Sequence, residues 1–290
     1  MDLKNTFEAL VHVAKQCFNT SVSLGKVVLR LGHIASLPKA AEPSCIVLGN
    51  GPSLSQSFSD HPDFFKKHPL VCVNSFSLSE KYAELKPSYY VMLDPGFWLN
   101  DGELVRSTME SIKSKTSWPL GLFAPVQAKR SVFLKMLQDE NPNIRVTFFN
   151  YTVFKGFKAL SHIFYKRNMA MPQCQNVVAA SLFLSVNMGF RNVYLFGADH
   201  TWHQHLHVDE DNTVCVKQIH FYENTEKINY VPFYKGLHLK EVFRMDELFM
   251  IFGKTFYSYM AINEYALSRS CTIYNASAIS YIDAFKRIRL

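Results

Sequence analysis

The sequence of 290 residues lacks closely paired cysteines, because none of its six cysteines belongs to a C-x-x-C pair. Cys45 and Cys72 fall inside apolar runs, where a free cysteine behaves as a small buried hydrophobic residue. The other four are widely spaced, at Cys17, Cys174, Cys215 and Cys271. This pattern is typical of free thiols in a reducing cytoplasm.

Long apolar runs are missing as well. No stretch reaches the roughly 20 apolar residues that a membrane-spanning helix needs. The opening MDLKNTFEAL leads into no apolar signal-peptide core. We therefore expect a cytoplasmic protein, located at the inner face of the cell membrane if it contacts lipid.

The chain also has no long block of Lys and Arg, although its formal net charge is +7. A positive balance favours an anionic partner such as a nucleotide, a nucleic acid or an acidic membrane surface. Scattered basic residues without a nucleic-acid-binding motif argue against nucleic acid as the main partner.

Three common enzyme signatures are absent. The sequence has no G-x-G-x-x-G followed by an acidic residue about 20 positions on, and no G-x-x-x-x-G-K-[ST] loop. It also has no G-x-S-x-G nucleophile elbow. These absences argue against a dehydrogenase, a P-loop phosphotransferase and a serine hydrolase.

What the sequence does contain is an alternation of strand-like and helical patterns. Strands are expected at 45–48, 70–76, 89–94, 119–125, 144–150, 191–197 and 271–277, and the clearest helices at 131–139, 176–190 and 246–269. Strands separated by helices predict an α/β fold with a doubly wound, mainly parallel, Rossmann-like sheet.

The same patterns divide the chain into four parts. We expect an N-terminal amphipathic helix (1–40), a nucleotide-binding α/β domain (41–200), a lid (201–240), and a C-terminal helix and strand that complete the α/β domain (241–290). The segment called the lid is rich in Tyr and His and poor in core periodicity.

Residues 3–34 carry apolar side chains at three- and four-residue steps, including Phe7, Leu10 and Phe18. We favour a helix packed on the domain or on a second subunit of a homo-oligomer, because Asp2 and Glu8 dilute its basic face. The alternative is a helix that makes peripheral contact with a membrane surface.

A glycine-rich turn follows the first expected strand, in SCIVLGNGPSLSQSF (44–58). Gly49 and Gly51 permit close backbone approach, Pro52 suits a first helical turn, and Ser53 can cap exposed amides. A strand, a glycine-rich turn and a helix N-terminus together favour an anion site, with a simple tight turn as the alternative.

Polar residues follow four of the expected strands, and a parallel sheet places such positions at one edge. Any one of them alone is most simply a turn former. Their convergence predicts a shared site built from Asn50 with Ser53, Asn74, Asp94, and Asp199 with His200.

The ordered set IVLGNGPSL, VCVNSF, VMLDPGFW and MGFRNVYLFGAD resembles the bacterial sialyltransferases of glycosyltransferase family 42. Its layout is also similar to that of the MptE-like group, domain of unknown function 115. The resemblance covers roughly residues 44–200 and implies a GT-A-type variant of the Rossmann-like fold. It also implies a nucleotide-binding set of Gly49, Asn50, Gly51, Pro52, Ser53 and Asn74.

The sequence departs from that family at several positions. Asp94 stands where the family has Asn, and Asn176 replaces a Thr-Ser-Gly that supplies hydroxyl contacts. A family tyrosine that holds the leaving phosphate falls near Thr201. The family's general-base histidine follows Tyr-x-Gly, and YKGLH makes His238 the similar residue here.

The segment DHTWHQHLHVDED (199–211) is rich in histidine and aspartate. Alternating histidines suit either a metal site or a polar loop that faces substrate, and we favour the loop because the segment has no Cys/His framework. Trp202 could then form a platform for a sugar. His200, beside Asp199, is the second candidate for the catalytic base.

Tyrosine and lysine side chains follow in the lid. Tyr230 and Tyr234 are candidates for holding a leaving phosphate, together with Tyr222, Lys227 and Lys235, because hydroxyl and ammonium groups can neutralise it without metal. The alternative is a surface loop with aromatic anchors.

Together these features predict a glycosyltransferase that moves a sugar, such as sialic acid or a related nonulosonic acid from a CMP-sugar, to a bacterial surface glycan. The nucleotide-sugar donor and the glycan acceptor are its substrates, with a histidine base, no cofactor and no required metal. One alternative is an MptE-like pterin diphosphokinase, which would need a divalent metal at Asp94, Asp199 and the histidines. Another is a nucleotide-binding scaffold at a membrane-associated complex.

Overall fold

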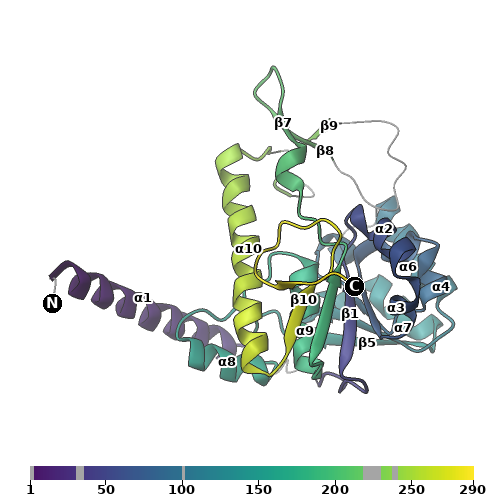
Figure 1. Cartoon of the computed structure of the whole chain (residues 1–290), viewed down its shortest axis with the longest axis horizontal. Helices are drawn as coiled ribbons and strands as arrows, with labels where there is room; N and C mark the ends of the chain where they lie inside the picture. Colours follow the sequence, from purple (N-terminus) through teal and green to yellow (C-terminus); the bar gives the residue numbers. More distant parts are fainter. Residues whose placement is uncertain (1–2, 31–35, 100–101, 218–229, 237–240) are drawn as a thin grey trace.

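The computed structural model describes residues 3–30, 36–99, 102–217, 230–236 and 241–290. Its centre is an eight-stranded sheet in the order β11-β10-β6-β1-β2-β3-β4-β5 (Figure 1), and every neighbouring pair is parallel. The strands are β1 (Ser44–Leu48), β2 (Leu70–Val73), β3 (Tyr89–Val91), β4 (Leu120–Pro125), β5 (Ile144–Phe149), β6 (Asn192–Phe196), β10 (Thr272–Asn275) and β11 (Lys286–Arg287). The predicted α/β fold with a doubly wound parallel sheet is confirmed.

Helices cover both faces of this sheet, so its central strands are apolar throughout. In β1, Cys45 and Val47 face one core cluster while Ile46 and Leu48 face the other. The first cluster lies under α8 (Lys158–Lys166), α9 (Val177–Met188) and α10 (Met245–Ser268). The second lies under α2 (Ser53–Asp60), α3 (Pro62–Lys66), α4 (Lys81–Leu85), α6 (Glu103–Lys115) and α7 (Val132–Glu140).

Helix α9 is the buried helix that the sequence predicted at 176–190. All of its residues except Asn187 are buried. The Asn176 side chain caps it by accepting a hydrogen bond from the Ala179 amide at 2.8 Å, and Gly189 ends it in the left-handed conformation.

Two strands are shorter than the sequence predicted. The strand expected at 70–76 ends at Val73, because Asn74 adopts a left-handed φ of 48° and begins a 3-10 helix, Asn74–Leu78. The strand expected at 89–94 ends at Val91, and Asp94 then forms a turn into α5 (Gly96–Leu99). Both changes place polar residues in loops at the carboxyl edge of the sheet.

The lid holds a small antiparallel sheet of β7 (Leu206–Val208), β8 (Val214–Lys217) and β9 (Tyr230–Pro232). Val214 packs there with Leu248 and Phe252 of α10. Figure 1 shows this sheet beyond the N-terminal end of α10, on the side of the molecule where the central strands end.

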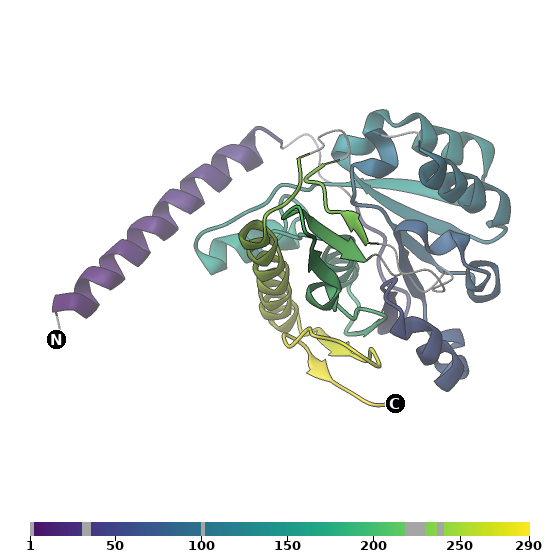
Figure 2. The same ribbon diagram turned by 90° about the horizontal axis from the view of Figure 1, so that it is seen from above.

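Helix α1 (Leu3–Val28) extends away from the rest of the molecule (Figures 1 and 2). The interpretation that it packs along the domain is wrong for most of its length. Only Thr20, Ser23 and Val27 are buried, because the helix docks by a short polar face near its C-terminal end. No described helix is long and apolar enough to cross a membrane.

Candidate functional site

The site lies where the order of the sheet reverses. From β1 the chain adds β2 to β5 on one side, and it then returns to place β6 and β10 on the other side. The loops that follow β1 and β6 therefore flank the topological switch point, where open α/β sheets bind ligands. These loops are 49–53 and 197–201.

The two loops pack directly against each other. The Gly49 amide donates to the Phe196 carbonyl, and the Gly51 amide donates to the Gly197 carbonyl, each at 2.8 Å. A Cβ at Gly49 would lie 2.4 Å from the Gly197 oxygen. A Cβ at Gly51 would lie 2.6 Å from the Asp199 carboxylate. The second loop therefore fills the space that the sequence analysis assigned to a ligand beside these glycines.

Asp199 occupies the N-terminal end of α2. Its carboxylate accepts hydrogen bonds from the Ser53 amide at 2.9 Å and from the Ser53 hydroxyl at 2.5 Å. Burial raises the pKa of Asp199, and the two Ser53 hydrogen bonds oppose that rise. Pro52 stands at the N-cap position with no side-chain cap. The first-turn amide predicted to meet a phosphate is thus already paired with an anion of the protein.

Asn50 and Asn74 follow the neighbouring strands β1 and β2. The Asn50 amide nitrogen donates to the Val73 carbonyl at 3.2 Å, which fixes the orientation of its side chain. The side-chain oxygens of both asparagines are buried and have no hydrogen-bond partner among the described residues. Orphaned buried oxygens are uncommon and costly, so each one requires an explanation.

Asp94 follows β3 at the same edge of the sheet. It is exposed, and its carboxylate accepts the Gly96 amide at 2.8 Å. The turn-forming interpretation therefore explains one of its oxygens and leaves the other to solvent. The structure brings Asn50, Asn74 and Asp94 to successive strand ends, as the sequence order predicted.

On the other side of the switch point, His200 is enclosed rather than open to a substrate. Its Nε2 lies 2.6 Å from the Tyr259 hydroxyl and 3.4 Å from the Asn176 side-chain nitrogen, and its ring packs on Trp202 at 4.1 Å. Only 7% of the residue is exposed. Burial lowers the pKa of His200 to about 3. Such a histidine is neutral at pH 7 and a weak base, so its geometry is that of a positioning residue.

Tyr259 is a member of this cluster that the sequence analysis missed. Its hydroxyl also contacts the Asn176 side chain, which donates to it at 2.9 Å. The residue lies in α10, where it belongs to an aromatic and apolar pattern typical of a core helix. No signal in the sequence separates it from the neighbouring core residues. Asn176 is thereby a helix cap and part of a buried polar network.

The remaining histidines of 199–211 do not converge. His203 packs on Tyr281, His205 lies 3.4 Å from the Thr201 hydroxyl, and His207 packs on Tyr230. Within the residues that the structure describes, no group of three or more His, Cys, Asp or Glu side chains could hold a metal ion. Trp202, the predicted sugar platform, is half-buried between His200 and Phe252.

The lid residues predicted to hold a phosphate differ in whether their polar groups are free to contact a ligand. Tyr230 and Tyr234 are both exposed. Lys235 is paired with Glu241 at 2.6 Å and with Glu247 at 2.8 Å, which leaves little of its charge for a ligand. His238, Tyr222 and Lys227 lie outside the described residues.

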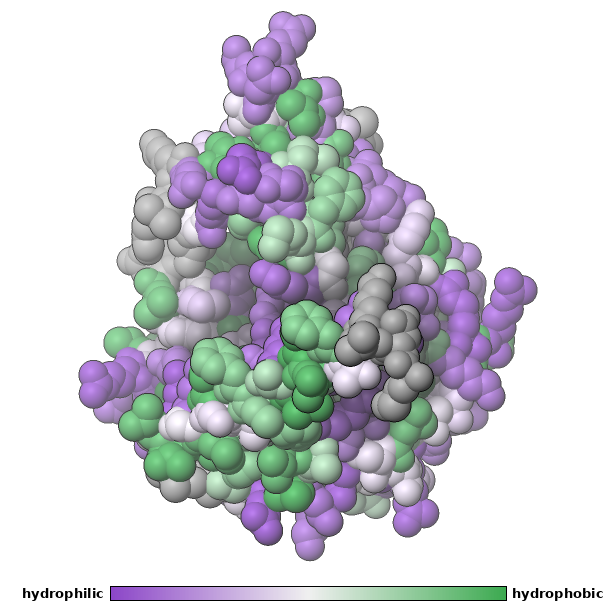
Figure 3. Space-filling view, turned by 90° about the vertical axis from the view of Figure 1, so that its left-hand side faces the viewer, coloured by the Kyte–Doolittle hydropathy of each residue, from purple (hydrophilic) through white to green (hydrophobic). Residues whose placement is uncertain are grey.

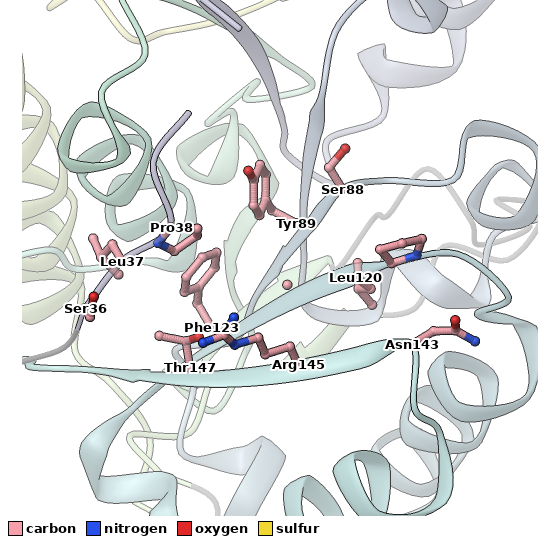
Figure 4. A pocket seen from close by; sticks show the side chains of 12 residues that line it. Ser36, Leu37, Pro38, Ser88, Tyr89, Leu120, Phe123, Asn143, Arg145 and Thr147 are labelled. Carbon is pink, nitrogen blue, oxygen red and sulfur yellow. The ribbon is translucent and has the colours of Figure 1, made fainter. Parts of the chain in front are cut away.

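A cavity of about 610 Å³ lies at the opposite edge of the sheet (Figure 4). Ser88 and Asn143 precede β3 and β5, and Tyr89, Phe123 and Arg145 project from the strands. This hollow is therefore at the amino ends of β3 to β5. Open α/β sheets bind their ligands in the loops at the carboxyl ends of the strands. We therefore place the site at the switch point and not in this cavity.

Comparisons with known proteins support the fold. No family model matches the chain, and no curated protein matches it in sequence. Among solved structures, the chain is similar to the MAf glycosyltransferase from Magnetospirillum magneticum AMB-1, with a TM-score of 0.50 and 12% sequence identity. The match covers 88% of this chain and 35% of that chain, so this chain spans about a third of its neighbour's length. At this identity the likeness shows a shared fold.

Proposed function

We propose that the protein is a glycosyltransferase that uses a nucleotide-sugar donor, bound at the carboxyl ends of β1, β2 and β3. The observation that carries the proposal is the pair of buried side-chain oxygens on Asn50 and Asn74, which find no hydrogen-bond partner in the part of the chain that the structure describes. Two such groups, each following one of two neighbouring strands, cost stability unless a ligand supplies their hydrogen bonds. The fold shared with a glycosyltransferase adds support.

These two oxygens define which part of the donor they meet. An amide oxygen only accepts hydrogen bonds, and a phosphate at neutral pH also has mainly acceptors. The partners of Asn50 and Asn74 must therefore be donors, such as ribose hydroxyls or the amino group of cytosine. Asp94, one strand further along, can accept from the same nucleoside. This edge accordingly holds the nucleoside and not its phosphate.

The phosphate then belongs on the lid side. The carboxylates of Asp94 and Asp199 repel a phosphate, and Asp199 already takes the α2 amide. The exposed Tyr230 and Tyr234 hydroxyls of the lid are the groups available to stabilise the departing phosphate. The pairing of Lys235 with two glutamates favours tyrosine hydroxyls over lysine in this role.

For the chemical step we propose His238 as the base. It removes the proton from an acceptor hydroxyl while that oxygen attacks the anomeric carbon and the nucleotide leaves. His200 holds the loop after β6 through Tyr259, because its buried ring is a weak base. On the sequence resemblance, the donor is a CMP-activated sialic or related nonulosonic acid and the acceptor a bacterial surface glycan. No metal is required.

The diphosphokinase alternative needs a divalent cation between β- and γ-phosphates. Asp199, one of its expected ligands, is engaged with Ser53, and Asp94 lies at the end of a different strand. The arrangement of the described residues therefore favours glycosyl transfer.

A panel of nucleotides tests the proposal. CMP, UDP, GDP and ATP are added with and without magnesium, and the shift in melting temperature is measured. We expect stabilisation by CMP that does not depend on magnesium. Stabilisation by ATP only with magnesium would support the diphosphokinase instead.

Turnover measurements then test the catalytic role. His238→Ala should lower transfer or donor hydrolysis by about 10²–10⁴-fold, with CMP binding retained, because a base contributes on that scale. His12→Ala, on α1, is the matched control and should leave turnover unchanged. Loss of activity in EDTA with recovery in magnesium would contradict the metal-free mechanism. Nucleotide binding without any turnover would favour a scaffold.

A further inference from the structure

Helix α1 carries a broad apolar face that is open to solvent. Phe7 is 68% exposed, Leu10 is 65% exposed and Phe18 is 70% exposed. Their three- and four-residue spacing places them on one side of the helix, together with Val11 and Val28. Figure 3 shows hydrophobic residues gathered over the lower part of the side of the molecule from which α1 extends.

The body of the protein contacts a different side of the same helix. The Phe157 amide donates to the Thr20 hydroxyl at 3.0 Å, and the Ser23 hydroxyl donates to the Lys155 carbonyl at 2.9 Å. At 3.6 residues per turn, Thr20 points about 200° away from Phe18. The docking of α1 therefore turns the apolar face away from the protein and fixes it there.

Positive charge borders this face. In α1 the exposed Lys15 and Lys26 lie along one flank, which they share with Glu8, the single acidic residue of the helix. Lys155 and Lys254 of the body add positive charge near Lys26. Desolvation lowers the pKa of Lys155, and the charges of Lys254 and Lys26 lower it further. A helix with a wide apolar face and a basic flank is the form that binds at the surface of an anionic bilayer.

A second copy of the chain fits this face less well. Cys17, Ser21 and Gly25 interrupt the apolar stripe, so a helix–helix seam there would bury little apolar area. Pairing two such helices would also bring basic flanks together with only Glu8 to offset them. A lipid surface has neither restriction, because acyl chains adapt to small residues and anionic headgroups neutralise the lysines.

We propose that α1 is a membrane-surface anchor that lies in the headgroup region of an anionic phospholipid bilayer, with the apolar face of Phe7, Leu10, Val11 and Phe18 inserted. The rest of the chain then stands at the bilayer, joined through the Thr20 and Ser23 contacts. This proposal rests on α1 and does not depend on the chemistry at the switch point.

Vesicle flotation with the full chain tests the anchor. Vesicles of phosphatidylcholine alone are compared with vesicles in which about 30% of the lipid is the anionic phosphatidylglycerol. We expect the wild type to float with the anionic vesicles and to be released by high salt. Phe7→Asp with Phe18→Asp should weaken this binding by at least ~10-fold, because two inserted aromatic rings are lost.

The matched control is Leu104→Asp with Val132→Asp, which replaces two exposed apolar residues on α6 and α7. This variant should float like the wild type. Light scattering measures the oligomeric state of the same proteins. Equal flotation of the α1 variant and the wild type would overturn the proposal, as would absence of wild-type binding to anionic vesicles. A dimer that the α1 substitutions dissociate, with no vesicle binding, would assign the face to a second copy.

Discussion

At the scale of single residues, the site joins polar side chains from two separate parts of the chain, the loops after β1 to β3 and the loop after β6. Asn50, Asn74 and Asp94 could be grouped from their positions after successive strands, because parallel strands end at one edge. The partners of Asp199 could not be predicted, since Ser53 lies 146 residues away in the chain. The same limit hid the contact of His200 with Tyr259, which only the folded chain brings together.

The buried state of His200 predicts a specific dependence of stability on pH. A histidine whose pKa in the folded protein is lowered binds fewer protons than it does in the unfolded chain. Its stabilising contribution is therefore complete above its ordinary pKa of 6.5 and is lost as the pH falls towards about 3. Asp199 has the opposite effect: because its pKa is raised in the folded protein, its contribution to the free energy of unfolding increases as the pH falls.

Replacing His200 with Asn isolates its contribution. Asparagine tolerates the left-handed φ of 56° at this position and retains a hydrogen-bonding side chain. Between pH 6.5 and about 3, the free energy of unfolding of the wild type should fall relative to His200→Asn, with a slope of up to about 1.4 kcal/mol per pH unit. Denaturant unfolding at several pH values measures this difference in the free energy of unfolding. Parallel pH profiles for the two proteins would show that His200 is not buried and neutral.

At the scale of elements, helices and strands with a long, clear hydrophobic pattern could be predicted from the sequence, and short ones could not. The apolar run of α9, with its capping Asn176 and terminal Gly189, gave both ends of that helix nearly correctly. The strands of the lid were not predicted, because β7 to β9 hold only three or four residues each, too few for a clear strand pattern. For α1, periodicity predicted the helix but not which face would meet the protein.

The docking of α1 depends on Gly156. This glycine has a φ of 128°, and a Cβ there would lie 2.0 Å from the Thr20 hydroxyl oxygen and 2.7 Å from the Thr20 backbone nitrogen. Gly156→Ala should therefore release α1 from the body while leaving the central sheet intact. Hydrogen exchange at the Lys155 and Phe157 amides, which donate to Ser23 and Thr20, should become faster.

Gly25→Ala is the matched control on α1 itself. Apart from the helix's own backbone, its Cβ would meet no atom of the described residues within 4 Å, and alanine favours a helix over glycine by about 1 kcal/mol. It should leave exchange at Lys155 and Phe157 unchanged or slower. Slow exchange retained in Gly156→Ala would mean that α1 docks in some other way.

At the scale of the whole molecule, alternation of strands and helices was enough to predict a doubly wound parallel sheet, because that arrangement buries both faces of every central strand. The order of the strands, and with it the switch point between β1 and β6, required the structure. That order explains why the loops 49–53 and 197–201 lie together. It also explains why Gly49 and Gly51 are needed for the close packing of these two loops, whether or not a ligand is bound.

The central claim is that the nucleoside binds at Asn50 and Asn74, and calorimetric titration with CMP tests it most directly. Asn74→Gly removes the side chain while keeping the left-handed backbone, which glycine adopts without strain. Asn143→Ala removes an exposed asparagine at the opposite edge of the sheet as a control.

We predict that the wild type and Asn143→Ala bind CMP equally, and that Asn74→Gly binds it about 10-fold more weakly, since one hydrogen bond to a buried acceptor is worth about 1.4 kcal/mol. Equal CMP affinity in all three proteins, or no heat of binding in the wild type, would contradict the account.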